Sequence, residues 1–162
     1  MLFAAFTSAM IVRQGISSDW VPTQLPGILY FNTILLLASS LTLELARQSL
    51  AADRGVQFTR WLYGTVALGL GFVAGQLLAW QELVSRGVYL STNPSSSFFY
   101  LLTAAHGIHL LGGIAALCYL VFHSRRLALK LKSHAAVDAT AAYWHFMDGL
   151  WLYILVLLVT RL

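Results

Sequence analysis

Long apolar runs separated by short polar segments dominate the chain. Four of them reach or exceed about 20 residues, the length that an α-helix needs to cross a hydrocarbon core about 30 Å thick. They cover residues 25–46, 61–83, 95–122 and 139–160. The opening apolar run, residues 1–12, is too short to span by itself. The pattern predicts an all-α, polytopic transmembrane helix bundle with four complete helices and a partial or short N-terminal helix.

Turn-forming residues mark the boundaries between these helices. Pro26-Gly27 precedes the second helix, Asp53-Arg54-Gly55 separates the second from the third, and the Asn- and Ser-rich stretch at 91–97 leads into an N-cap before the fourth. We place the helices at approximately 1–14, 25–47, 60–84, 95–123 and 139–161, within a single transmembrane domain over residues 1–162. The sequence contains no internal repeat and no soluble domain.

Composition supports the membrane assignment and excludes several classes of function. Hydrophobic residues make up 59% of the 162, and charged residues 10%, against roughly 25% in a soluble domain. The basic residues lie in loops rather than in a patch with aromatics, so nucleic acid is not an expected partner. Cys118 is the one cysteine, which excludes an internal disulfide. No phosphate loop, dinucleotide fingerprint or nucleophile with a neighbouring base is present, so we expect no catalytic residue in this chain.

The first apolar run does not have the charge pattern of a signal peptide. No basic residue precedes its apolar part, and Arg13 follows it, which is the opposite of the charge order in a signal sequence. We interpret this run as part of a transmembrane helix whose beginning lies before Met1 or is missing.

Lys and Arg residues predict the orientation of the bundle. With five helices the loops alternate between the two membrane surfaces, and seven basic residues fall on one side against three on the other. The basic side is expected to be cytoplasmic, which puts the C-terminus on the outer side. The seven are Arg47, Arg54, Arg60, Arg125, Arg126, Lys130 and Lys132, and the three are Arg13, Arg86 and Arg161.

Four ionisable side chains fall deep inside the predicted membrane. Counting about 1.5 Å per helical residue from the outer surface puts His106 about 16 Å deep and His109 about 21 Å deep. Counting from the inner surface puts His145 about 9 Å and Asp148 about 13 to 14 Å up, at the levels of His109 and His106. An ionised carboxylate at such depth costs at least about 2.5 kcal/mol unless it has a partner. Depth therefore predicts two pairs, Asp148 with His106 and His145 with His109.

A metal site built from these four side chains is chemically possible, because imidazole and carboxylate suit several metals. Hydrogen bonding between buried polar groups already accounts for them, so we expect a structural or lipid- or proton-linked cluster and no metal, haem or other cofactor ligand in this chain.

Milder polar residues lie on the second and third helices. Ser and Thr hydroxyls commonly bond the carbonyls of their own helix, whereas Glu44 falls at the inner boundary, within reach of headgroups or of Arg47. Gly71 and Gly75 form a G-x-x-x-G pair that permits close helix packing. The other intramembrane polar residues are Asn32, Thr33, Ser39, Ser40, Thr42 and Gln76.

Five motifs in order, from about residue 19 to the end, resemble subunit III of haem-copper oxidases of the cytochrome c oxidase type. The first two are Leu25-Pro26 with Asn32-Thr33 and Ser39-Ser40-x-Thr42, and Gln76-x-x-x-Trp80. The next two are Phe98-Phe99 and His106-Gly-Ile-His109 with Gly112. The last is Tyr143-Trp144-His145-Phe146-x-Asp148-x-x-Trp151.

The resemblance implies a subunit without redox centres, in a complex that oxidises cytochrome c, reduces oxygen to water and pumps protons. Haem and copper would lie in subunit I, the main contact, and copper also in subunit II. The family member stabilises subunit I, holds phospholipid between its helices and supports proton uptake. A bacterial five-helix form would lie in the inner, cytoplasmic membrane with its C-terminus outside.

The sequence departs from the family in two places. A membrane glutamate carried by the family would fall just before Met1, and Ala79 stands where the family often has Glu. The resemblance therefore supports assembly with subunit I more strongly than it supports lipid contact or a role in proton uptake.

Other functions remain open at this level. Subunit III of a quinol oxidase and the related accessory subunit of nitric oxide reductase share these motifs. A small proton-coupled transporter would also explain ionisable groups at mid-membrane, but it predicts repeats and broken helices that the sequence does not show.

Overall fold

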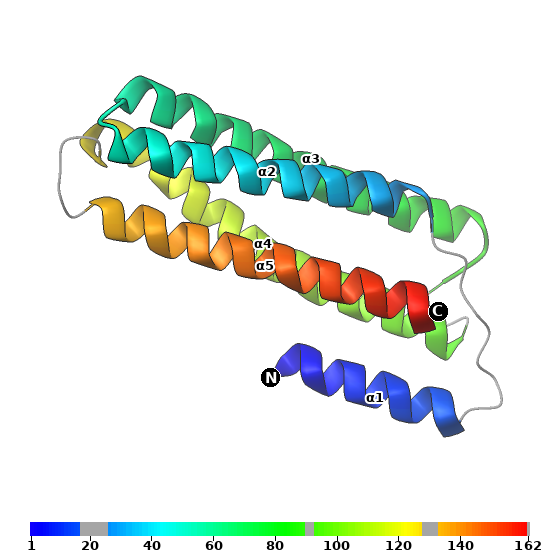
Figure 1. The fold of residues 1–162 in the computed structure, drawn as a ribbon. Coiled ribbons are helices and arrows are strands. Elements are labelled where there is room, and N and C mark those ends of the chain that lie inside the picture. The colour runs from blue at the N-terminus through cyan, green and yellow to red at the C-terminus, as the bar shows by residue number, and fades with distance from the viewer. Residues whose placement is uncertain (17–25, 90–92, 128–132, 162) are drawn as a thin grey trace.

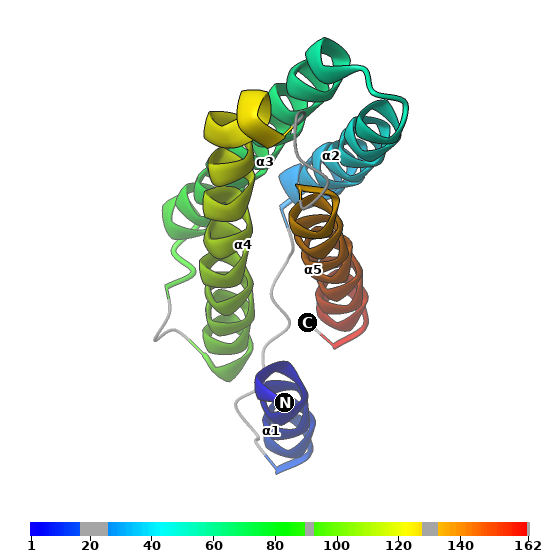
Figure 2. The ribbon, with the colours of Figure 1, turned by 90° about the vertical axis from the view of Figure 1, so that its left-hand side faces the viewer.

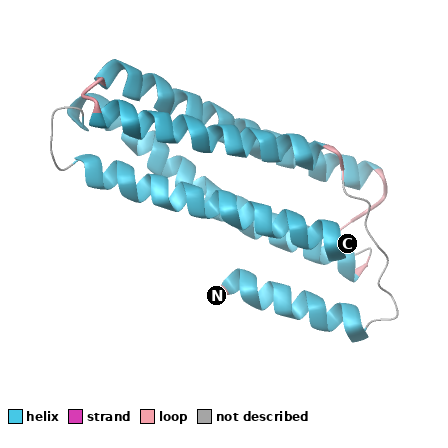
Figure 3. Ribbon diagram, viewed as in Figure 1, coloured by secondary structure: helices cyan, strands magenta, loops and turns pink. Residues whose placement is uncertain are grey.

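A computed structural model describes residues 1–16, 26–89, 93–127 and 133–161. These residues form helices and the turns between them, without a strand (Figure 3). The helices are α1 (Leu2–Ile16), α2 (Ile28–Ala51), α3 (Gly55–Ser85), α4 (Pro94–Leu127) and α5 (Ser133–Arg161). The all-α prediction is confirmed.

Helices α2 to α5 form one bundle, and α1 lies beside it (Figures 1 and 2). In the bundle α2 packs against α3, α3 against α4, α4 against α5, and α5 against α2, which closes the ring. Helix α1 contacts α4. It also reaches α5 through the Tyr153 hydroxyl, which donates to Thr7 Oγ1 at 2.9 Å, and through Gln14 Nε2, which donates to the Arg161 carbonyl at 3.3 Å.

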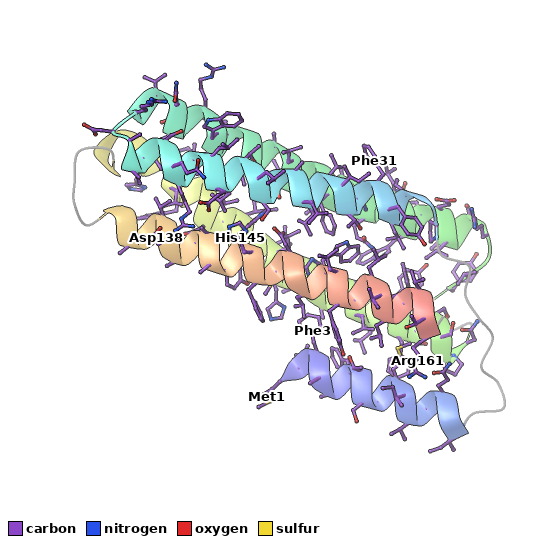
Figure 4. The ribbon with its side chains drawn as sticks, viewed as in Figure 1. Met1, Phe3, Phe31, Asp138, His145 and Arg161 are labelled. Carbon is purple, nitrogen blue, oxygen red and sulfur yellow. The ribbon has the colours of Figure 1, made fainter. Side chains whose placement is uncertain are left out.

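Helices α2 to α5 are each long and apolar enough to cross a membrane, as predicted, and α1, with 15 residues, is shorter. Large apolar side chains stay exposed on the outside of the bundle, among them Phe31 on α2, which points away from the other helices (Figure 4). A soluble protein would bury most of these side chains, whereas a membrane protein presents them to lipid or to other membrane subunits.

Local sequence explains where the helices end. After α2 and after α3 the chain folds back in the same motif, in which two backbone N–H groups bond carbonyls of the last turn and one residue adopts a left-handed conformation. That residue is Asp53 (φ 58°) after α2 and Gly87 (φ 78°) after α3. At the start of α4 the Asn93 side chain accepts the Ser96 N–H at 2.8 Å, as an N-cap before Pro94 should.

Glycines on α3 bring neighbouring helices close. A methyl group at Gly75 would collide with the Asn32 amide on α2, and one at Gly69 would lie 2.9 Å from the Trp144 ring on α5. A methyl group at Gly71 would lie 3.6 Å from Leu35, an ordinary contact. In the predicted G-x-x-x-G pair, Gly75 therefore makes the close approach and Gly71 does not.

The Gly75 contact gives a test of this packing. We expect Gly75→Ala to lower the free energy of unfolding by about 1 to 3 kcal/mol, because the fully buried Asn32 has little room to move. The matched control is Gly107→Ala on α4, where an added methyl group meets nothing within 4 Å. This variant should be neutral or more stable by up to about 1 kcal/mol. Unfolding of the purified protein with SDS in mixed micelles measures both, and equal losses would contradict the assigned contact.

Candidate functional site

Several polar residues of α2 and α5 face one another across one interface. On α2, residues 40, 44 and 47 are four and three positions apart, so they lie on one face of the helix. On α5, residues 138, 145 and 148 are seven and three positions apart and also share one face. We call this interface the α2–α5 polar seam. It comprises Ser39, Ser40, Glu44 and Arg47 of α2, with Asp138, Trp144 and His145 of α5.

At the end of the seam near the α2–α3 turn, charged groups join the two helices. Arg47 Nε donates to Asp138 at 2.9 Å and Arg47 Nη1 donates to Glu44 at 2.8 Å. Figure 4 labels Asp138 and His145 on α5. Glu44 lies 3.8 Å from His145 Nε2, and His145 Nδ1 lies 2.5 Å from the Ser40 hydroxyl. The arginine is thus held between two carboxylates, and the imidazole between a carboxylate and a hydroxyl.

Trp144 of α5 lies at the centre of the bundle and contacts the other three of its helices. Its indole N–H donates to Ser39 Oγ of α2 at 3.0 Å. Its ring lies against Gly69 of α3 and Gly113 of α4, where an added methyl group would come within 2.9 Å and 3.1 Å of it. A larger residue at either glycine would therefore displace the ring or its neighbours.

Trp151 repeats this arrangement two helical turns further along α5. Its indole N–H donates to Thr33 Oγ1 of α2 at 3.0 Å. Its ring meets Phe72 of α3 edge-on, with centroids 4.9 Å apart, and lies 5.1 Å from the His106 ring of α4. Seven residues separate Trp144 from Trp151, so both rings leave the same face of α5.

Each hydroxyl in these contacts both accepts and donates. Thr33 donates to the Leu29 carbonyl at 2.8 Å and Ser39 donates to the Leu36 carbonyl at 2.6 Å, which leaves their lone pairs free for the indole N–H groups. Thr103 of α4 does the same outside the seam, accepting Trp80 at 3.1 Å and donating to Phe99. The prediction that Ser and Thr bond their own helix is confirmed for Thr33, Ser39 and Thr42. Ser40 instead meets His145 of α5.

The two pairs predicted from depth are wrong. His106 is fully buried beside Phe72 and Trp151, and neither of its ring nitrogens has a hydrogen-bond partner among the described residues. Asp148, 4% exposed, has no such partner there either. His145 meets Ser40 and Glu44 instead of His109, whose Nδ1 lies 2.7 Å from the Ala105 carbonyl.

The remaining predicted polar residues divide between α2 and α3. The Thr42 and Thr65 hydroxyls lie 2.8 Å apart and join these two helices. Asn32 and Gln76 are buried, and their amide groups have no hydrogen-bond partner among the described residues. Glu44 bonds Arg47, one of the two partners expected for it.

The four ionisable residues do not form a metal site. Within the described ranges no three His, Cys, Asp or Glu side chains lie close enough together to hold a metal ion. Lys130 and Lys132, which contributed to the charge count, lie outside those ranges.

Sequence reasoning did not assign the two central tryptophans or Asp138 to the site. Their spacing carried a usable signal, because Trp144 and Trp151 are seven residues apart on α5 and their acceptors Ser39 and Thr33 are six apart on the antiparallel α2. Aromatic donors and hydroxyl acceptors at similar spacings on antiparallel helices make α2 and α5 candidate neighbours.

Four apolar helices long enough to span a membrane, joined by a partly buried polar seam, define a multi-pass integral membrane protein. A sequence model of the family described as cytochrome c oxidase subunit III matches residues 1–160. The chain belongs to this family, and so forms part of an oxidoreductase complex with other oxidase subunits.

Individual relatives agree with the family assignment. A cytochrome c oxidase subunit 3 of Thermostichus vulcanus is 28% identical over 162 residues, which cover 98% of this chain and 79% of the relative. A probable cytochrome c oxidase subunit 3 of Nocardia farcinica is 34% identical over 163 residues, covering 94% and 77%. That of Mycobacterium tuberculosis is 33% identical over 156 residues, covering 93% and 74%. These comparisons favour cytochrome c oxidase over the quinol oxidase and nitric oxide reductase alternatives.

The bond between Trp144 and Ser39 can be tested by a double-mutant cycle. Trp144→Phe and Ser39→Ala should show a coupling energy of about 0.6 kcal/mol, and no more than about 1.7, because interhelical hydrogen bonds in membranes have this size. The matched control combines Trp144→Phe with Thr33→Val, since Thr33 bonds Trp151 instead. That pair should be additive to within about 0.5 kcal/mol. SDS unfolding measures the three single and two double variants, and coupling of the control pair alone would refute the assignment.

Proposed function

We propose that this chain is the non-catalytic subunit III of a proton-pumping cytochrome c oxidase. The enzyme would take electrons from cytochrome c and reduce oxygen to water in the aerobic respiratory chain. The observation that carries the proposal is the family match, which extends over residues 1–160 and so includes α1, the whole bundle and the polar seam.

The polar side chains of the bundle bond one another, which supports a structural role for the chain. Both nitrogens of His145 face partners within the chain, Ser40 and Glu44, and both central indoles are committed to hydroxyls of α2. These groups hold helices together. The haem and copper of the complex are proposed to lie in subunit I, with further copper in subunit II, as the family resemblance implies.

The outside of the bundle provides the surface for assembly. Exposed apolar side chains run the length of the helices, including Phe31, Ile34 and Leu41 on α2 and Ile108 on α4. Subunit I is the proposed main contact, subunit II and other subunits would complete the complex, and phospholipid would cover the remaining apolar surface. A face held rigid by the tryptophan contacts would stabilise subunit I during turnover.

We place the protein in a bacterial inner, cytoplasmic membrane. The end of the bundle that carries Arg47, Arg54 and Arg60 would face the cytoplasm, and the C-terminus would lie on the outer side. The charged end of the α2–α5 polar seam then lies at the cytoplasmic surface. The role in proton uptake implied by the family resemblance is proposed for this surface.

Purification through an affinity tag on this chain tests the assignment. We expect a haem- and copper-containing subunit to co-purify, and the isolated complex to reduce oxygen with cytochrome c as electron donor. An unrelated tagged membrane protein from the same cells is the control for non-specific capture. Recovery of the chain free of haem and copper would refute the proposal, and oxidation of quinol in place of cytochrome c would restore the quinol oxidase alternative.

Deletion of the chain tests its role inside the complex. We expect the remaining subunits to assemble and begin turnover at a normal rate, then to lose activity faster than the complete enzyme, because subunit I has lost its support. The measurement is oxygen consumption over successive turnovers. Complete loss of haem reduction at the outset would instead indicate a catalytic role for the chain.

A further inference from the structure

A cavity of about 320 Å³ lies between α2 and α3, apart from the α2–α5 polar seam. Its lining residues are Thr42 of α2 and Gln57, Arg60, Trp61 and Gly64 of α3. The lining residues on α3 are spaced three or four positions apart around the helix, so they lie on one of its faces. The volume is at the lower end of the range for small-molecule sites.

The cavity carries a positive charge that its lining does not balance. None of the described residues that line it is acidic. Arg47, on the neighbouring helix at the same end of the bundle, differs because it bonds both Glu44 and Asp138. A guanidinium at a membrane boundary favours an anionic partner, and phosphate suits its paired N–H donors.

The cavity also changes in character with depth. Arg60 is five residues into α3, about 8 Å along the helix, and Gly64 is about 14 Å along. At the deeper end the Thr42 methyl group faces Gly64, with its Cγ2 atom 4.0 Å from where a methyl group on Gly64 would lie. The Thr42 hydroxyl is turned to Thr65 and to its own helix. The outer part of the cavity is therefore polar and cationic, and its floor is apolar.

A charged outer part, an apolar floor and an aromatic side chain at the rim match one class of ligand. Basic pockets between transmembrane helices at a cytoplasmic surface bind anionic lipid headgroups, and tryptophan prefers the level of the headgroups. Trp61, 37% exposed, lies at this level beside Arg60.

We propose that this cavity binds one anionic phospholipid. Its phosphate would bond Arg60 and Gln57, and the first carbons of an acyl chain would run over Gly64 and the Thr42 methyl group. The inference deepens the lipid contact named in the proposed function, and rests on it, by giving that contact a site and a headgroup charge. An acidic side chain of another subunit would satisfy Arg60 but would not fill the floor of the cavity.

Lipid binding to the purified complex tests the charge of the headgroup. The complex is stripped of lipid in detergent and titrated with phosphatidylglycerol or with phosphatidylcholine of the same acyl chains, and bound lipid is counted by mass spectrometry. The unaltered complex should bind phosphatidylglycerol in preference, and Arg60→Gln should weaken this binding about fivefold. The matched control is Arg54→Gln, which removes the same charge six residues earlier, outside the cavity lining, and should retain the preference.

A second pair of variants tests the apolar floor without altering charge. Gly64→Leu fills the floor and should reduce binding of both lipids. Gly107→Leu, at an equally uncrowded position on α4, should leave binding unchanged. Equal affinity in Arg60→Gln and Arg54→Gln would overturn the proposal. So would displacement of the lipid by inorganic phosphate at equal concentration, because the site would then recognise phosphate alone.

Co-purification of the other subunits is scored on the same samples. Loss of the haem and copper subunit from the unaltered complex would count against the proposed function. Normal assembly without a preference for phosphatidylglycerol would count against the lipid site alone.

Discussion

Two tryptophans of one helix hold this bundle together. Trp144 and Trp151 extend from the same face of α5 and each reaches α2, α3 and α4. Each gives its N–H to a hydroxyl that is already bonded to its own helix, so neither of these two indole donors is left unpaired in a medium that offers no water. The glycines at 69 and 113 are needed because the Trp144 ring occupies the space that their side chains would fill.

The α2–α5 polar seam extends the same interface to the end of the bundle. Charged groups lie at the end near the α2–α3 turn, and hydroxyl and indole groups lie further along the helices, where neutral hydrogen bonds are the less costly choice inside a membrane. Such a gradient gives α2 and α5 one register, because a shift by one residue would separate every donor from its acceptor.

Sequence spacing indicates how far along its helix each polar residue lies, but not which way its side chain points. Asp148 is buried in the bundle, yet its predicted partner was wrong. The partner of a residue depends on the direction in which its side chain leaves the helix and on which helix lies there. The deduced pairing of α5 with α4 through His106 and His109 missed α2, because equal depth says nothing about rotation around the helix axis. The Ser39-Ser40 and Trp144-His145 motifs were interpreted separately. In the structure Ser39 bonds Trp144 and Ser40 bonds His145.

By itself the sequence determined the number and type of long helices, their end signals and the membrane environment, because hydropathy and run length act locally along the chain. Its ordered motifs also indicated the family. Only the tertiary structure decided which helices are neighbours, which hydroxyl accepts which indole, and which cavity contains an unbalanced arginine. These features join residues up to 118 positions apart, and they depend on how the helices rotate and pack against one another, which no single segment specifies.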